Sequence, residues 1–243
     1  SNIADAEAGV AIDLLLSYRA TSAWSDMVAL TQKMSPPLKQ TVLVREQLGL
    51  ALNRLKHRDE AERVLSDLLL EKGSGSETLG ILGRVYKDRW EEELTLGNQI
   101  AAEGYLEKAI GTYLSGFETD WRDAYPGVNA LTLMELKEPP DERRLRILPV
   151  VRYAVERKIA KGKPDYWDHA TLLELAVLAM DRTEAARALP QALASLREPW
   201  EAETTARNLR LIREAREKRG VVPSWLKEIE DLLSRRFSGP KSA

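Results

Sequence analysis

One stretch decides the fold of this chain: Leu82-Gly83-Arg84-Val85-Tyr86, followed by Ala102, Leu106 and Ala109. An earlier stretch has the same order of residues, with Leu48-Gly49 followed by Ala61 and Leu65. In each case the Leu-Gly pair falls on one predicted helix and the alanine falls on the next. A pairing that recurs in this way indicates helical hairpins stacked in succession.

The spacing is typical of the tetratricopeptide repeat, in which small residues lie where two antiparallel helices cross closely. Large apolar residues then fill the gap between successive pairs. The predicted fold is therefore all-α, a right-handed superhelical solenoid of about six antiparallel helix pairs of this type. We expect residues 1–237 to form a single repeat domain and residues 238–243 to be a disordered tail.

Apolar periodicity and the positions of proline and glycine place the helices of each predicted pair. We expect the second helix to end before Pro36-Pro37, and Phe117–Pro126 to form an aromatic linker. The predicted pairs are Ile3–Arg19 with Trp24–Met34, Leu38–Lys56 with Asp59–Glu71, Ser76 to beyond Trp90 with Gln99–Leu114, Gly127–Lys137 with Asp141–Lys161, Asp165–Met180 with Thr183–Leu196, and Pro199–Lys218 with Pro223–Phe237.

The third pair is longer than the second. Leu48 and Ala61 are thirteen positions apart, whereas Leu82 and Ala102 are twenty positions apart. The third pair therefore carries about seven extra residues around Glu91–Asn98, which either lengthen its first helix or form a protruding loop.

Composition excludes several classes of function. The 243 residues are 44% hydrophobic, enough to bury a core as one or two globular units, and their net charge of −2 gives no basic field for nucleic acid. The chain has no cysteine, which excludes disulfides, thiolate metal sites and cysteine nucleophiles. No apolar run approaches the roughly 20 residues of a membrane span, and no signal peptide is recognisable. We expect a cytoplasmic protein without cofactor, metal, nucleic acid or membrane as a partner.

Several stretches together resemble the tetratricopeptide regulatory region of the apoptosis signal-regulating kinases, also called the kinase-associated TRAFs-binding domain. They are Leu82–Asp88, Ala51–Arg54, Gly127–Leu131, Trp167 with Ala170–Glu174, and Trp200 with Thr204-Thr205 and Asn208-Leu209. The resemblance implies a helical-repeat module that positions or restrains signalling partners, of the bacterial type that lacks the kinase. The sequence contains neither a Gly-rich loop nor the Asp-Phe-Gly of a kinase.

The first helix of each tetratricopeptide pair lines a concave groove, with positions one, four and five after the glycine pointing into it. These positions place Asn53 and Arg54 beside Arg84, Lys87 and Asp88. The donor-rich patch would suit a carboxylate or phosphate. The structural alternative is that Arg84 and Asp88 form an (i, i+4) ion pair that only solvates the helix.

Three residues on later first helices, Asn129, Glu174 and Asn208, could extend the groove, or could be ordinary solvated residues. Trp121 and Tyr125 lie in the predicted linker and are candidates for an exposed aromatic anchor. The other tryptophans, among them Trp167 and Trp200, are interpreted as packing residues between repeats.

Catalysis has little support in the sequence. His57 and His169 are the only histidines, and neither has partners at metal-ligand or triad spacing. Four arginines at three-residue intervals are interleaved with glutamates, and we interpret them as a solvated face; they are Arg207, Arg210, Arg213 and Arg216.

Two functions follow from these patterns. The first is a non-enzymatic interaction scaffold that binds a peptide or protein in its concave groove, in signalling. The second is a ligand-sensing regulatory domain, in which the patch around Arg84 and Lys87 binds a small anion or nucleotide and controls an effector domain absent from this chain.

Overall fold

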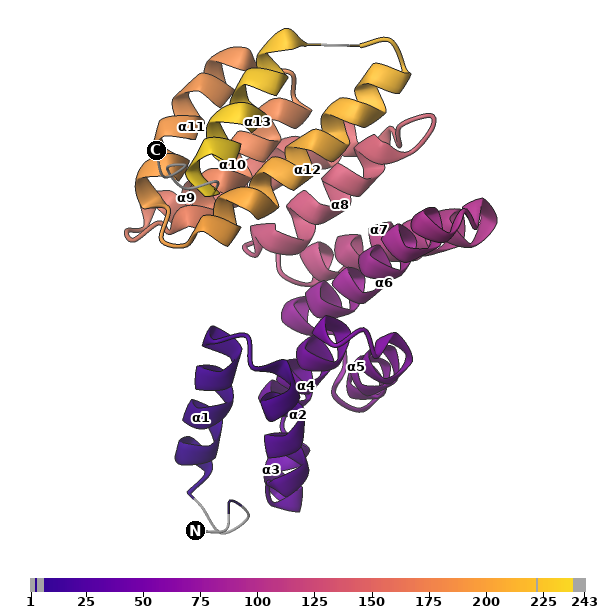
Figure 1. Cartoon of the computed structure of the whole chain (residues 1–243), viewed down its shortest axis with the longest axis vertical. Coiled ribbons are helices and arrows are strands. Elements are labelled where there is room, and N and C mark those ends of the chain that lie inside the picture. The colour runs from indigo at the N-terminus through magenta and orange to yellow at the C-terminus, as the bar shows by residue number, and fades with distance from the viewer. Residues whose placement is uncertain (1–2, 4–6, 222, 238–243) are drawn as a thin grey trace, which may run out of the picture. The chain divides into compact units, whose positions relative to one another are not determined.

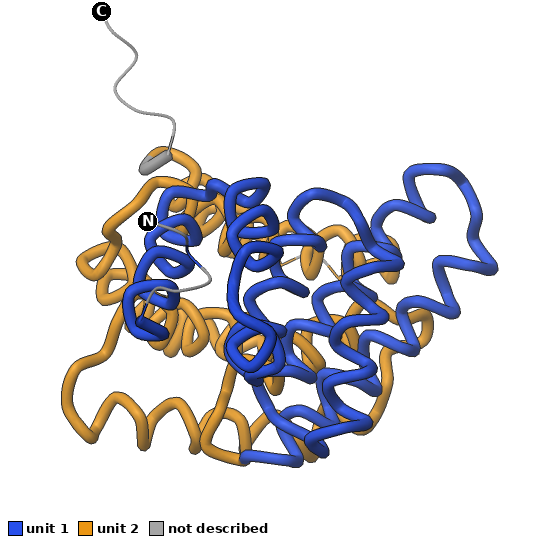
Figure 2. Tube along the Cα trace, turned by 90° about the horizontal axis from the view of Figure 1, so that it is seen from below, with its two compact units in different colours: residues 1–120 blue, residues 121–243 orange. Residues whose placement is uncertain are grey.

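The computed structural model describes residue 3, residues 7–221 and residues 223–237, and within these residues every regular element is a helix. The all-α prediction is confirmed. The chain divides into two compact units, Ser1–Asp120 and Trp121–Ala243, shown in separate colours in Figure 2. The single repeat domain over residues 1–237 stays a prediction, and the predicted tail lies outside the described residues.

Seven helices form the first unit (Figure 1). They are α1 (Ala8–Ala20), α2 (Trp24–Lys33), α3 (Pro36–Lys39), α4 (Val42–Arg54), α5 (Arg58–Lys72), α6 (Ser76–Leu96) and α7 (Gln99–Thr119). Helices that follow each other in the chain pack together: α4 against α5, and α6 against α7 along much of their length. The first helices of these two pairs, α4 and α6, also contact each other.

Six helices form the second unit, which has the same pairing of neighbours. They are α8 (Ala124–Leu136), α9 (Arg143–Ala160), α10 (Tyr166–Leu178), α11 (Arg182–Ser195), α12 (Pro199–Lys218) and α13 (Ser224–Phe237). Helix α10 contacts both α8 and α12, so these three first helices form a continuous set.

Glycine allows the paired helices to approach closely. A Cβ atom built on Gly83 of α6 would lie 2.8 Å from ring carbons of Tyr113 on α7. A Cβ atom on Gly49 of α4 would lie 2.7 Å from Cγ of Leu65 on α5. Both partner side chains are fully buried, so the Leu-Gly stretches mark the helix crossings of their pairs.

The extra residues of the third pair lengthen its first helix. Helix α6 continues through Glu91–Glu93 to Leu96, and Gly97 ends it with a φ of 76° in the left-handed region. Glycine occupies that conformation without the steric cost that a Cβ atom would add. Of the two arrangements that the sequence left open, the structure has the longer helix.

Helix α2 ends before Pro36, as predicted, but the predicted bounds of the next helix and of the linker are wrong. Pro36 and Pro37 begin the short helix α3, because proline fits the first turn of a helix, where the backbone N–H needs no partner. The predicted helix Leu38–Lys56 is therefore two helices, and the second begins where the Thr41 hydroxyl accepts a hydrogen bond from the Val44 N–H. Phe117 belongs to α7 and is fully buried, so the connection to α8 is only residues 120–123.

None of the helices in the described part of the chain is long and apolar enough to cross a membrane.

We predict that Glu46→Gln stabilises the protein at neutral pH and has little effect below about pH 4. The Glu46 carboxyl on α4 accepts a hydrogen bond from Thr78 of α6 at 2.6 Å, and burial raises its pKa above the ordinary 4.5. The folded protein then holds this proton more tightly than the unfolded chain. Its contribution to stability is complete below pH 4.5 and declines as the pH rises through the raised pKa. Urea unfolding at both pH values checks this, and an equal effect at both would contradict it.

Candidate functional site

Three of the predicted groove residues of the first unit form a hydrogen-bonded network across α4 and α6: Asn53, Arg84 and Asp88. The Asn53 amide donates to Oδ2 of Asp88 at 2.8 Å, and Nε of Arg84 donates to Oδ1 of the same carboxylate at 2.7 Å. Asp88 thus joins the two helices through both of its oxygens. The (i, i+4) pair between Arg84 and Asp88, which was the structural alternative, is present.

A second cation, Arg58, completes this network, and the sequence did not single it out. Arg58 is the first residue of α5, and its Nη1 donates to Oδ1 of Asn53 at 2.8 Å and also to the Asn53 carbonyl. Its Nη2 reaches Oε1 of Glu92 at 2.7 Å, and its guanidinium lies 3.8 Å from Asp88. Arg58 therefore ties the end of α4 to α6.

The network is balanced in charge, whereas the sequence predicted a patch rich in donors. Two guanidinium groups, of Arg58 and Arg84, face two carboxylates, of Asp88 and Glu92. Asn53 and Lys87 are buried, with 1% and 3% of their surface exposed. Arg54 is exposed, and its guanidinium lies 5.7 Å from the ring centre of Trp24.

The second unit has a similar link between its first helices. Glu174 of α10 accepts hydrogen bonds from the Thr132 hydroxyl of α8 and, at 3.2 Å, from the Asn208 amide of α12. An amide and a carboxylate thus connect α10 to α12, as they connect α4 to α6. Asn129 is not part of this link, because its amide donates to the carbonyl of Tyr125 on its own helix.

Exposed aromatic residues lie at two places in the second unit. Trp121 and Tyr125 are 53% and 45% exposed, as an aromatic anchor requires. Trp167 and Trp200 are also exposed, but their ring centres lie 5.6 Å apart, so these two pack between α10 and α12 at the surface and not in a buried core. Each stands near the start of its helix, and the two side chains pack against each other at the surface.

Comparison with known proteins now gives the family. The sequence pattern described as the MAP3K TRAFs-binding domain matches residues 2–230 of the chain. The chain belongs to this family.

A curated relative of this TRAFs-binding domain is the mitogen-activated protein kinase kinase kinase nsy-1 of Caenorhabditis elegans, which is 27% identical over 220 residues. The match covers 82% of the chain and 14% of the relative. The chain therefore spans about one seventh of that kinase's length, and the resemblance stated from sequence is confirmed at the level of the family.

Two groups of charged residues in this TRAFs-binding domain have structural roles. The triplet His57-Arg58-Asp59 has the letters of a kinase catalytic loop, but Arg58 binds the end of α4 and Asp59 pairs with Arg89. Arg216 is buried, although it was interpreted as part of a solvated stripe. Each three-residue step turns a side chain by about 60° around the helix, so Arg216 lies opposite Arg207.

Proposed function

We propose that the chain is a non-enzymatic interaction module of the tetratricopeptide type, which binds a peptide or protein partner in signalling along the groove formed by its first helices. The observation that carries this proposal is the match over residues 2–230 to a family described by the binding of TRAF proteins. The similarity to a mitogen-activated protein kinase kinase kinase supports a role of this chain in signalling.

The geometry of the first unit favours a peptide partner that carries both acidic and basic side chains over a small anion. In the cluster of Arg58, Arg84, Asp88 and Glu92 each guanidinium is already paired with a carboxylate, so a free phosphate or nucleotide would have to displace an internal ion pair. A peptide with alternating acidic and basic side chains can exchange partners with Arg84 and Asp88 at the partly exposed edge of this pair. Buried Asn53 and Lys87 would then position this edge.

The experiment that tests the proposal is capture of partners by the tagged chain from cells of its native organism, followed by titration of the purified partner. We predict that Arg84→Ala weakens binding about tenfold, because a charge-assisted hydrogen bond contributes roughly 1.5–3 kcal/mol. The matched control is Arg63→Ala, an exposed arginine on α5. Its affinity should equal that of the parent.

Two outcomes would contradict this proposal. One is a chain that captures no protein at all. The other is a partner that binds the Arg84 variant as tightly as the parent and is lost when Trp121 or Tyr125 is replaced by alanine. In the second case the aromatic anchor, and not the network of α4 and α6, would be the binding surface.

A further inference from the structure

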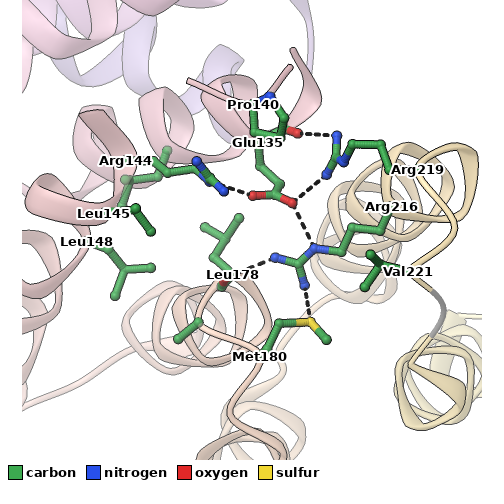
Figure 3. Close-up of a pocket in the computed structure, with 12 residues that line it drawn as sticks. Glu135, Pro140, Arg144, Leu145, Leu148, Leu178, Met180, Arg216, Arg219 and Val221 are labelled. Carbon is green, nitrogen blue, oxygen red and sulfur yellow. Dashed lines mark hydrogen bonds and ion pairs between the residues drawn. The ribbon is translucent and has the colours of Figure 1, made fainter. Parts of the chain in front are cut away.

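A pocket of about 460 Å³ opens on the second unit, between the ends of α8, α10 and α12 and the first turns of α9 (Figure 3). Its volume lies within the range of sites that hold a small ligand or a few peptide side chains. One part of its wall is charged and another is aliphatic. None of its lining residues was named as a candidate site from the sequence.

The charged wall is built around a single carboxylate. Glu135 is 3% exposed, and its Oε2 accepts a hydrogen bond from Nε of Arg144 at 2.9 Å. Its Oε1 accepts from Nε of Arg216 at 2.8 Å and from Nη2 of Arg219 at 2.6 Å. These four are the charged residues of the lining, so three guanidinium groups and one carboxylate give it a net charge of +2.

Two of the three arginines also stabilise helix ends. Arg216 donates to the carbonyls of Val177 and Leu178 at the end of α10, and Arg219 donates to the Glu135 carbonyl at the end of α8. Cations at helix C-termini are favourable, so part of the positive charge has a structural role.

Arg144 has capacity left for a ligand. Its Nε donates to Glu135 and its Nη1 donates to the Asp141 carbonyl. Within the described residues, nothing accepts a hydrogen bond from its Nη2. The guanidinium is therefore held in place by two bonds while one edge remains available to an acceptor in the pocket (Figure 3).

The aliphatic wall faces the same space. Leu145 and Leu148 of α9 lie beside Arg144, with Leu178 on the neighbouring helix α10 (Figure 3). Leu131 of α8 also lines the pocket. Leu145 is 67% exposed and lines the pocket, so its side chain is accessible to a ligand. A ligand that fills the pocket would meet an anion-binding group and an apolar surface at once.

We propose that this pocket binds an acidic side chain flanked by aliphatic side chains, in a segment of the protein partner. The inference rests on the proposed function and names a binding site for it. The carboxylate of the segment accepts hydrogen bonds from Arg144, and its aliphatic neighbours cover Leu145 and Leu148. The excess of two positive charges supplies the attraction, and the leucines distinguish a peptide from a free inorganic anion.

The test uses two synthetic peptides and the whole chain, with NMR signals of the leucine methyl groups and of the arginine Nε–H groups as the readout. One peptide is acetyl-Leu-Glu-Leu-Glu-Leu-amide, and the other has glutamine at both glutamate positions. We expect the acidic peptide to shift the signals of Arg144, Leu145 and Leu148 and to bind about tenfold tighter than its neutral counterpart. Inorganic phosphate is titrated in parallel and should bind more weakly.

Two variants and a matched control complete the design. Arg144→Gln should lose about tenfold in affinity for the acidic peptide, and Glu135 keeps its two other arginines in this variant, so the fold should persist. Leu145→Ser, at an exposed position, should lose a few-fold. Arg146→Gln removes the same charge from an exposed position of α9 outside the pocket lining and should bind like the parent.

Four results would overturn the inference: equal affinity for the two peptides, no shifts of the three signals at millimolar peptide, unchanged binding by Arg144→Gln, or phosphate binding as tight as the acidic peptide. Failure here is distinguishable from failure of the proposed function. A partner captured by the chain and released by Arg84→Ala would uphold the interaction module even if the pocket binds no peptide.

Discussion

Gly83→Leu is expected to lower the free energy of unfolding of the first unit by about 3 kcal/mol, the upper end of the usual cost of overpacking. A Cβ atom at this position already falls 2.8 Å from the ring of Tyr113, well inside van der Waals contact. Tyr113 is fully buried in α7, so the ring has no free space into which it can move. A leucine would therefore force α6 away from α7.

The control for this prediction is Gly104→Ala on α7, where a new Cβ atom meets nothing within 4 Å. Alanine in a helix interior is favoured over glycine by roughly 0.5–1 kcal/mol, so this variant should be more stable than the parent. Urea unfolding followed by circular dichroism measures both effects. If Gly83→Leu unfolds at the same urea concentration as the parent, the close crossing of α6 and α7 does not exist in solution.

The sequence predicted the helices well where periodicity and end signals agree. Residues Pro199–Lys218 form α12 with the predicted bounds, because Pro199 suits a first turn and the apolar residues keep one face. The length of α6 could not be decided from the sequence. The residues Glu91–Glu93 have good helix propensity, but none of them is apolar, so this segment lacks the apolar periodicity that predicts a helix. The division of the predicted helix Leu38–Lys56 at Thr41 was not predicted. Its main local signal is a single N-cap, in which the Thr41 hydroxyl accepts a hydrogen bond from the Val44 N–H.

The candidate site was harder to predict, because it depends on contacts between helices. The (i, i+4) spacing of Arg84 and Asp88 is visible in the sequence and is found as an ion pair. The contribution of Arg58 depends on how α5 returns along α4, which no local pattern contains. Spacing rules gave Lys87 the same orientation as Arg84, yet only 3% of Lys87 is exposed. The burial of Lys87 depends on how the neighbouring helices pack around α6, which residue spacing does not contain.

The same reasoning explains why the pocket of the second unit was not predicted. Arg216 and Glu135 are 81 residues apart in the sequence, and each looks like an ordinary charged residue on its helix. A buried charge is recognisable only when its partners are known, since an isolated one would cost several kcal/mol. The cluster of Glu135 with three arginines is therefore a property of the tertiary structure.

That cluster leads to the second large effect. Glu135→Gln is expected to lower the free energy of unfolding of the second unit by about 3–5 kcal/mol, the usual cost of removing one partner from a buried ion pair. The new amide has nearly the same shape as the carboxylate, so packing changes little. What changes is the charge: Arg216, which is buried, loses the one carboxylate among its partners in the described residues.

The matched control is Glu156→Gln, which removes the same charge from an exposed (i, i+4) pair with Arg152 on α9. Such surface pairs contribute roughly 0.3–0.5 kcal/mol, so the control should unfold almost like the parent. Urea unfolding of both variants at one salt concentration measures the difference.

A double variant tests the physical cause. Arg216→Met alone should also destabilise the second unit, because the carbonyls of Val177 and Leu178 lose a donor. A chain that carries both Glu135→Gln and Arg216→Met lacks the carboxylate and the buried guanidinium of this ion pair, so neither charge is left unpaired by the loss of the other. The combined loss should then be smaller than the sum of the two single losses, as it is for residues in direct contact. Strictly additive losses, or a Glu135→Gln variant as stable as Glu156→Gln, would show that the carboxylate of Glu135 does not hold this cluster together.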